Sequence, residues 1–191
     1  TYAKGSSDLA VLRRALHAMD RKLDAAWAQR APDTPLKTPQ EALILASIVE
    51  KETGKPADRA LIAGVFTNRL RSGMLLQTDP TVIYGLGTSF DGNLRKRHLL
   101  ADTPWNTYTR VGLPPTPIAM PGAASLLAAV QPAQTKALYF VARGDGTSQF
   151  KEGWGPGGGG EVGVSTTKRG GPGHFQAVAV GTRQEEGVVG H

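Results

Sequence analysis

The chain has 191 residues, of which 40% are hydrophobic, and a formal net charge of +6. That length suits one folded domain, and the charge favours acidic partners without bearing on the fold. The absence of cysteine excludes disulfides, thiolate metal sites and thiol nucleophiles. The longest apolar run, residues 42–49, is far shorter than the roughly 20 residues of a membrane span, so no spanning helix is predicted within these residues.

The first predicted element is an amphipathic helix over residues 7–28, capped by Ser6 or Ser7. Its apolar residues recur at spacings of three and four, which is typical of one buried helical face. They are Leu9, Leu12, Leu16, Met19, Leu23 and Trp27.

A second helix is predicted to open at a capping box. Thr38 is placed at the N-cap, Pro39 at the first helical position, and Glu41 reaches back to the cap amide. The helix should run to about Thr53, with Gly54 as a left-handed stop. Apolar residues lie nearly all round its first two turns, which predicts burial on most sides.

The remaining elements are shorter. A third helix is expected over residues 57–71, ended by Gly73, and a short one over 79–84. The loop at 106–121 is long enough to favour a functional role. A helix at 123–130 and a hairpin with strands 137–142 and 147–150 should follow.

The glycine content divides the chain near residue 150. From Lys151 onward, 41 residues hold 13 of the 24 glycines, and four basic residues balance four acidic ones. We therefore predict an α+β fold: a mainly helical catalytic domain at 1–150 with a buried glutamate-bearing helix and a small β-hairpin. Residues 151–191 should form a disordered, Gly-rich tail.

Glu50 is the residue whose position most requires a reason. It follows eight mostly apolar residues on the helix expected to be buried, where a carboxylate is costly unless it is paired or used. Its helical neighbours, Leu43, Ala46 and Thr53, suggest an apolar setting that favours the protonated acid. The structural alternative is an ion pair with Arg69 of the next helix.

Glu52 lies two residues further on and should point to the other side of the helix, so the two glutamates are not a catalytic dyad. We expect Glu52 to act mainly through local salt bridges.

Two other polar clusters are candidates for binding. Gln77, Thr78 and Asp79 precede Pro80; helix capping would explain the last two but not Gln77. The segment 105–109 mixes aromatic and amide side chains of the kind that line sugar sites, and a strand edge is its structural alternative. Asn106 and Tyr108 are its candidates, expected in a groove rather than in the core.

Other chemistries find no support in the sequence. The four histidines have no ligand-like spacing, so no metal site is predicted. Neither a nucleophile-elbow motif nor a phosphate-binding loop occurs.

Several segments, taken in order, resemble the endolytic murein transglycosylase (YceG-like) family. The segment Leu45 to Thr53, with its Glu-Lys-Glu-Thr end, is similar to the family signature. Further matching segments are 65–70, 76–85, 106–108, 112–115 and 138–141. The resemblance covers residues 1 to about 150, and the Gly-rich tail departs from it.

The resemblance implies that Glu50 is the catalytic residue and that Gln77, Asn106 and Tyr108 are substrate-binding candidates. It implies no cofactor, peptidoglycan glycan strands as substrate, a link to the cell-wall synthesis machinery, and no nucleic-acid partner. It also implies a bacterial inner-membrane protein with one N-terminal anchor and an N-terminal subdomain, both missing from this chain, and with the catalytic domain outside the cytoplasmic membrane.

A lytic transglycosylase needs only one carboxyl group, whereas hydrolytic glycosidases usually need two. Glu50 would protonate the oxygen leaving C1 of N-acetylmuramic acid and then accept a proton from the C6 hydroxyl of that sugar as it closes on C1. The alternatives are a non-catalytic peptidoglycan-binding module and a pyridoxal-phosphate lyase using Lys51.

Residues 151–191 are predicted to be dispensable for folding, because few large apolar side chains are present to offset the entropy of ordering them. Limited proteolysis should cut there first. Protease resistance equal to that of residues 40–70 would contradict the boundary.

Overall fold

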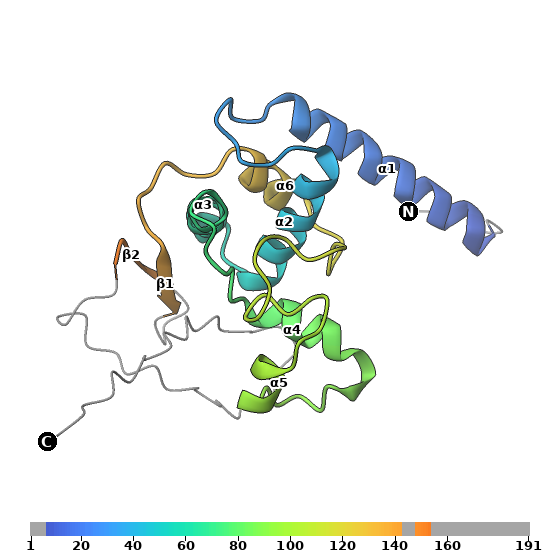
Figure 1. Ribbon diagram of the computed structural model, residues 1–191. Coiled ribbons are helices and arrows are strands. Elements are labelled where there is room, and N and C mark those ends of the chain that lie inside the picture. Colours follow the sequence, from blue (N-terminus) through green and yellow to red (C-terminus); the bar gives the residue numbers. More distant parts are fainter. Residues whose placement is uncertain (1–6, 143–147, 154–191) are drawn as a thin grey trace, which may run out of the picture.

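The computed structural model describes residues 7–142 and 148–153, which form a mainly helical fold with one small antiparallel hairpin (Figure 1). This confirms the predicted α+β class. The elements are α1 (Asp8–Ala28), α2 (Pro39–Glu52), α3 (Pro56–Arg71), α4 (Asp79–Leu86), the 3-10 helix η1 (Gly87–Ser89), α5 (Lys96–Leu100), α6 (Ala123–Val130), β1 (Tyr139–Ala142) and β2 (Ser148–Lys151).

Helix α2 is the centre of the core, as its apolar composition predicts. It packs against α1, α3, α4 and α6, and α6 makes the most extensive contact. Leu45, Ile48 and Val49 are fully buried, as are Val65 of α3 and Val130 of α6. Burying these side chains stabilises the fold by about 1.5–3 kcal/mol each.

Both ends of α2 are fixed by polar groups. At the start, the Thr38 hydroxyl accepts a hydrogen bond from the amide of Glu41 at 3.2 Å, which confirms the N-cap. The Glu41 carboxylate accepts from the amide of Lys37 at 2.5 Å instead of the expected amide of Thr38. At the other end, Thr53 is extended (φ −142°, ψ 136°) and Gly54 is not left-handed, so the predicted glycine stop is wrong.

Helix α1 starts as predicted, with the Ser7 hydroxyl accepting from the amide of Ala10. Its second half packs on the core through Leu23 and its neighbours. Its first half extends away from the body of the molecule (Figure 1), and Leu9, Leu12 and Leu16 are more than half exposed there. The predicted apolar stripe is therefore only partly buried.

The hairpin pairs β1 with β2 in antiparallel register, with Phe140 opposite Phe150. Phe140 packs edge-on against Phe66 of α3, with ring centroids 5.9 Å apart, and this contact attaches the hairpin to the helical core. Lys151 pairs with Tyr139, so the second strand extends one residue past the predicted boundary at 150. The turn around 144–146 and the tail from 154 lie outside the described residues.

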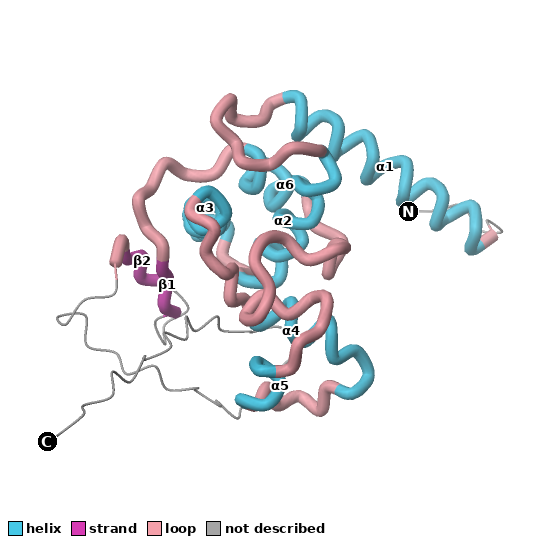
Figure 2. The backbone as a smooth tube through the Cα atoms, viewed as in Figure 1, coloured by secondary structure: helices cyan, strands magenta, loops and turns pink. Residues whose placement is uncertain are grey.

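Residues 106–121 form a long connection without helix or strand, as predicted (Figure 2). The amide of Ile118 donates to the Ser47 hydroxyl at 3.0 Å, and that hydroxyl donates to the carbonyl of Ile44. A buried serine of α2 therefore holds the loop against the helix. Within the described residues, no helix is long and apolar enough to cross a membrane.

Gly64 is buried in α3 where the segment after α6 passes over it. A Cβ atom there would lie 2.7 Å from the carbonyl oxygen of Ala133 and 2.8 Å from the Thr135 methyl group. We expect Gly64→Ala to destabilise the fold by about 1–3 kcal/mol, as overpacking typically does. Thermal unfolding would measure this. Gly54→Ala is the control, because nothing lies within 4 Å of its added methyl; equal melting temperatures for the two variants would contradict the packing argument.

Candidate active site

Glu50 lies in the last turn of α2 and is half-buried, with its carboxylate directed at the start of α6. One carboxylate oxygen, Oε2, accepts hydrogen bonds from the amide of Gly122 at 3.1 Å and from the Ser125 hydroxyl at 2.5 Å. Gly122 is the N-cap of α6 and Ser125 lies in its first turn. The N-terminus of a helix favours a negative charge, so α6 is an electrostatic partner for Glu50.

The surroundings of Glu50 lower the pKa of its carboxyl group. Partial burial acts in the opposite direction, but the hydrogen bonds from Ser125 and Gly122 and the positive charges of Arg59 and Lys51 outweigh it. The expectation of an apolar setting that favours the protonated acid is therefore wrong for the unliganded protein. The reason is tertiary, because the donors come from α6 rather than from the helix that carries Glu50.

Arg69 does not pair with Glu50 among the described residues, so the ion-pair alternative also fails. Its guanidinium group donates to the carbonyl groups of Leu138 at 2.7 Å, Leu76 at 2.9 Å and Leu75 at 3.1 Å. Arg69 therefore ties the hairpin and the connection after α3 to the core.

Glu52 is buried, 7% exposed, on another side of α2. Its Oε1 accepts a hydrogen bond from the Thr78 hydroxyl. Burial, opposed by that bond and reinforced by the charge of Asp79, raises the pKa of Glu52 to about 8. The expected local salt bridges are absent for this described residue, and the electrostatic setting predicted for Glu50 is found at Glu52 instead.

Asn106 is fully buried, which contradicts the expected groove position. Its amide nitrogen donates to the carbonyl groups of Ala101 at 2.6 Å, Leu99 at 3.0 Å and His98 at 3.3 Å, at the end of α5. Its side-chain oxygen accepts from the amide of Tyr108 at 2.8 Å. These contacts give Asn106 a structural role, and the side chain offers no free polar atom to a ligand in this conformation.

Tyr108 and Gln77 are both connected to the surroundings of Glu52: Glu52 acts electrostatically on Tyr108, and the Gln77 side chain accepts a hydrogen bond from Arg69, which also acts on Glu52. The Tyr108 hydroxyl donates to the Asp79 carboxylate at 2.5 Å, and burial, together with the charge of Asp79, raises the pKa of the phenol. Gln77 has a left-handed backbone (φ 51°), unusual for a residue with a Cβ. Its amide donates to the carbonyl of Thr107 at 3.0 Å, so both candidates belong to the junction of α4 with the long loop.

The end of α2 therefore places its two glutamates in different environments. Successive residues of a helix are about 100° apart, so Glu50 and Glu52 face nearly opposite directions. Glu50 faces the first turn of α6, and Glu52 faces the start of α4 and Tyr108. The hydrogen bonds of Glu50 therefore run to α6 and that of Glu52 runs to Thr78, a difference in partners that the sequence could not determine.

Several residues at the site were not identified from the sequence. Gly122 and Ser125 hold the Glu50 carboxylate, and the start of the correctly predicted helix at 123 was the signal available for them. Trp105, which the predicted sugar-site segment 105–109 includes, forms an edge-on pair with Tyr84, a residue that was not a candidate; the ring centroids are 5.6 Å apart, and Tyr84 is 45% exposed. Such a pair can stack on a sugar ring.

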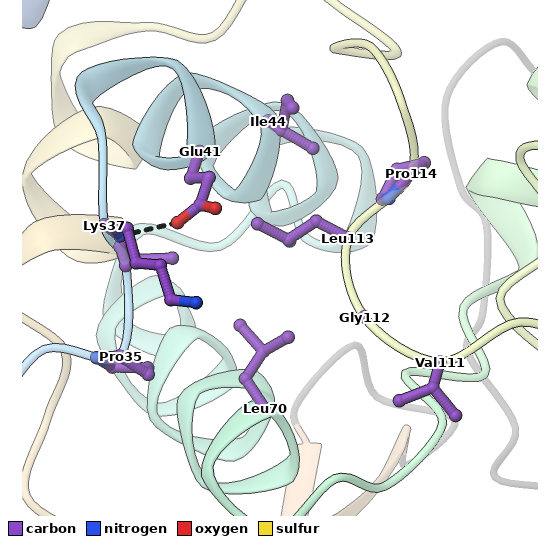
Figure 3. Close-up of a pocket in the computed structure, with 10 residues that line it drawn as sticks. Pro35, Lys37, Glu41, Ile44, Leu70, Val111, Gly112, Leu113 and Pro114 are labelled. Atoms are coloured by element: carbon purple, nitrogen blue, oxygen red, sulfur yellow. Dashed lines mark hydrogen bonds between the residues drawn. The ribbon is translucent and has the colours of Figure 1, made fainter.

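A cavity of about 450 Å³ lies at the opposite end of α2 (Figure 3). Its walls combine apolar and polar groups: Leu70 and Leu113 face each other across it, and the Lys37 side chain reaches into it. Glu41, which also lines it, precedes Glu50 by nine residues, or roughly 13 Å along a helix. The cavity therefore does not include the candidate catalytic carboxylate.

Groups of three or more potential metal ligands are absent from the described residues.

Comparison with known proteins gives a consistent result. The model of the YceG-like family matches residues 1–154. The chain is 48% identical over 108 residues to an endolytic murein transglycosylase of Bacillus subtilis (strain 168), covering 56% of this chain and 30% of that protein. It is 36% identical over 132 residues to the endolytic murein transglycosylase of Streptococcus pneumoniae serotype 2, covering 66% of this chain and 23% of that protein.

A crystal structure of a YceG-like protein from Listeria monocytogenes matches with a TM-score of 0.67 and 33% identity. The match covers 80% of this chain and 50% of that one. The chain thus spans less than a third of the length of the two curated relatives and half of the solved structure.

Asn106→Ala should destabilise the protein by about 1–3 kcal/mol, because it leaves buried carbonyl groups without a donor. Its melting temperature should fall markedly, while Asn93→Ala, in an exposed loop, should melt like the parent. An Asn106→Ala protein with an unchanged melting temperature and reduced glycan binding would restore the substrate-binding assignment.

Proposed function

This chain belongs to the YceG-like family, and from that membership we propose that it is the catalytic part of an endolytic murein transglycosylase. Such an enzyme is a lyase that cuts peptidoglycan glycan strands internally. Two relatives with this name support the proposal, although the chain spans only part of each. The observation that carries it is Glu50: a half-exposed carboxylate held by two donors at the end of a buried helix.

In the second half of the reaction Glu50 acts as a base, and its hydrogen bonds favour the carboxylate form that a base requires. After the bond between C1 of N-acetylmuramic acid and the oxygen of the next sugar breaks, the C6 hydroxyl oxygen of the same sugar bonds to C1. Its proton passes to the Glu50 carboxylate, which is the form that Ser125 and Gly122 favour. The product is a 1,6-anhydro end, and no water is consumed. Because the attacking hydroxyl is tethered to the reacting carbon, most of the ordering entropy is already lost.

The acid step needs the opposite protonation state. Glu50 must first give a proton to the leaving oxygen, yet the free site lowers the pKa of its carboxyl group. A glycan strand bound over the half-exposed side chain would exclude water, which disfavours the charged form and raises the pKa. Substrate binding therefore favours the protonated Glu50 that acts as the acid. After the proton has been transferred, the donors from α6 stabilise the carboxylate that acts as the base.

The charge around Glu50 also suits this substrate. Arg59 and Lys51 both act on the Glu50 carboxylate electrostatically, so the approach to the site is positively charged. Peptidoglycan carries carboxylates, which such a surface attracts. On the same family grounds, we propose that the complete protein works outside the inner membrane beside the cell-wall synthesis machinery, held by an N-terminal anchor.

The test is Glu50→Gln assayed by mass analysis of products from purified glycan strands. The amide keeps the size of the side chain but can neither give nor take the proton, so release of anhydro ends should fall at least ~100- to 10,000-fold. Glycan binding should persist. Stability should change little, because an amide oxygen can still accept from Gly122 and Ser125.

Glu41→Gln is the matched control, since Glu41 lies at the other end of the same helix, where its carboxylate accepts a hydrogen bond from the amide of Lys37. It should retain parent activity. Reducing ends instead of anhydro ends would indicate a hydrolase, and binding without any cleavage by the parent chain would favour the peptidoglycan-binding module. Anhydro ends released by Glu50→Gln at the parent rate would remove Glu50 from the reaction.

A further inference from the structure

The last turn of α2 carries the candidate catalytic carboxylate but has no left-handed glycine cap. Thr53 turns the chain into an extended conformation directly after Glu52. The last four carbonyl groups of a helix have no partner within the helix, so such a turn frays unless other groups hold it. Within the part of the chain that the structure describes, Glu50 binds the start of α6 and Glu52 binds Thr78 before α4, and both contacts hold this turn.

Glu52 lacks the contacts that an ionised carboxylate would need. Its Oε1 accepts from the Thr78 hydroxyl, and its Oε2 is buried with no hydrogen-bond partner among the described residues. No cation lies within ion-pair distance in the described part of the chain. Arg69 is nearby, but its guanidinium group is engaged by three backbone carbonyl groups. An ionised Glu52 would be a buried charge without compensation, which is strongly unfavourable.

We propose that Glu52, as a neutral acid hydrogen-bonded to Thr78, positions Glu50 by anchoring the last turn of α2 to the start of α4. This inference rests on the proposed function and gives the second glutamate of the Glu-Lys-Glu-Thr segment a role. Glu52 faces away from Glu50 and the start of α6, so it is a positioning residue. Its effect is transmitted through three consecutive helical residues.

The charged groups facing Glu52 come from three elements. Asp79 at the start of α4 and Arg69 of α3 act on it, and the Tyr108 phenol lies close to the same group. On its own helix, Lys51 and Glu50 point in other directions. Asp79 opposes ionisation and Arg69 favours it, while burial dominates and leaves the pKa at about 8.

This setting gives a pH dependence of defined sign. Because the native pKa of Glu52 is raised from 4.5 to about 8, its contribution to stability is complete at low pH and is lost as the pH rises through about 8. Above that range the ionised carboxylate should draw in water and release the last turn. Activity should therefore have an alkaline limb near pH 8 that belongs to Glu52. In the free protein the pKa of Glu50 is lowered, so its titration lies at lower pH than that of Glu52.

The experiment compares Thr78→Val and Glu52→Gln, with Thr67→Val as the matched control. Thr67 is equally buried, but its hydroxyl has no hydrogen-bond partner among the described residues. Thr78→Val should lower kcat by roughly 10- to 100-fold with little change in KM, because displacement of a catalytic group by about 1 Å can have that effect. Thr67→Val should keep parent kinetics.

Glu52→Gln preserves an acceptor for Thr78 and stays neutral at every pH. It should keep kcat within roughly threefold of the parent at pH 6, a difference below 1 kcal/mol. Its alkaline limb near pH 8 should disappear. A retained alkaline limb in Glu52→Gln, or equal kinetics for Thr78→Val and Thr67→Val, would overturn the proposal. Loss of all activity in folded Glu52→Gln would also overturn it, because Glu52 would then supply a proton itself.

A second measurement does not depend on turnover. Amide hydrogen exchange at residues 49–52 should accelerate in Thr78→Val and not in Thr67→Val, and carboxyl NMR should show the Glu52 titration near pH 8. If the parent chain released no anhydro ends while these results held, the proposed function would fail and the anchoring of the turn would stand. Unchanged exchange in Thr78→Val would reject the anchoring itself.

Discussion

The burial of α2 on almost every side governs how the other elements pack. A helix surrounded by α1, α3, α4 and α6 can carry apolar side chains through its middle and polar ones only where a partner meets them. Ser47 meets that condition by binding Ile44 and the amide of Ile118. The two glutamates of the last turn find different partners, Glu50 at the start of α6 and Glu52 at Thr78.

Glu50 and Glu52 show how surroundings separate two identical side chains. Glu50 is half-exposed, accepts two hydrogen bonds and has a lowered pKa. Glu52 is buried, accepts one and has a pKa of about 8. Near neutral pH one is an accessible carboxylate and the other a hidden acid. Of these two glutamates, Glu50 is the more exposed, so it is the one that suits the proposed reaction.

A buried polar layer joins the elements around the end of α2. Thr78, Thr81 and Thr107 are linked by hydrogen bonds between their side chains and backbones, and Arg69 and Asn106 bind backbone carbonyl groups beside them. Folding removes these polar groups from water, and each of them replaces the lost hydrogen bonds with bonds to another buried group. The amide and hydroxyl residues that look suited to sugar binding are thus partly used to hold the long loop in place.

The sequence was sufficient to predict the helical elements, the central buried helix, the cap at Thr38 and the family. Local signals such as apolar periodicity and capping residues act over a few positions, so they can be recognised without the fold. It also singled out Glu50, because a carboxylate after a long apolar run needs a reason. The protonation state of Glu50 depends on the folded arrangement, because its hydrogen-bond donors Gly122 and Ser125 lie more than 70 residues away along the chain. The same physical reason, contacts between segments distant in sequence, placed Asn106 in the core and gave Glu52 the environment expected for Glu50.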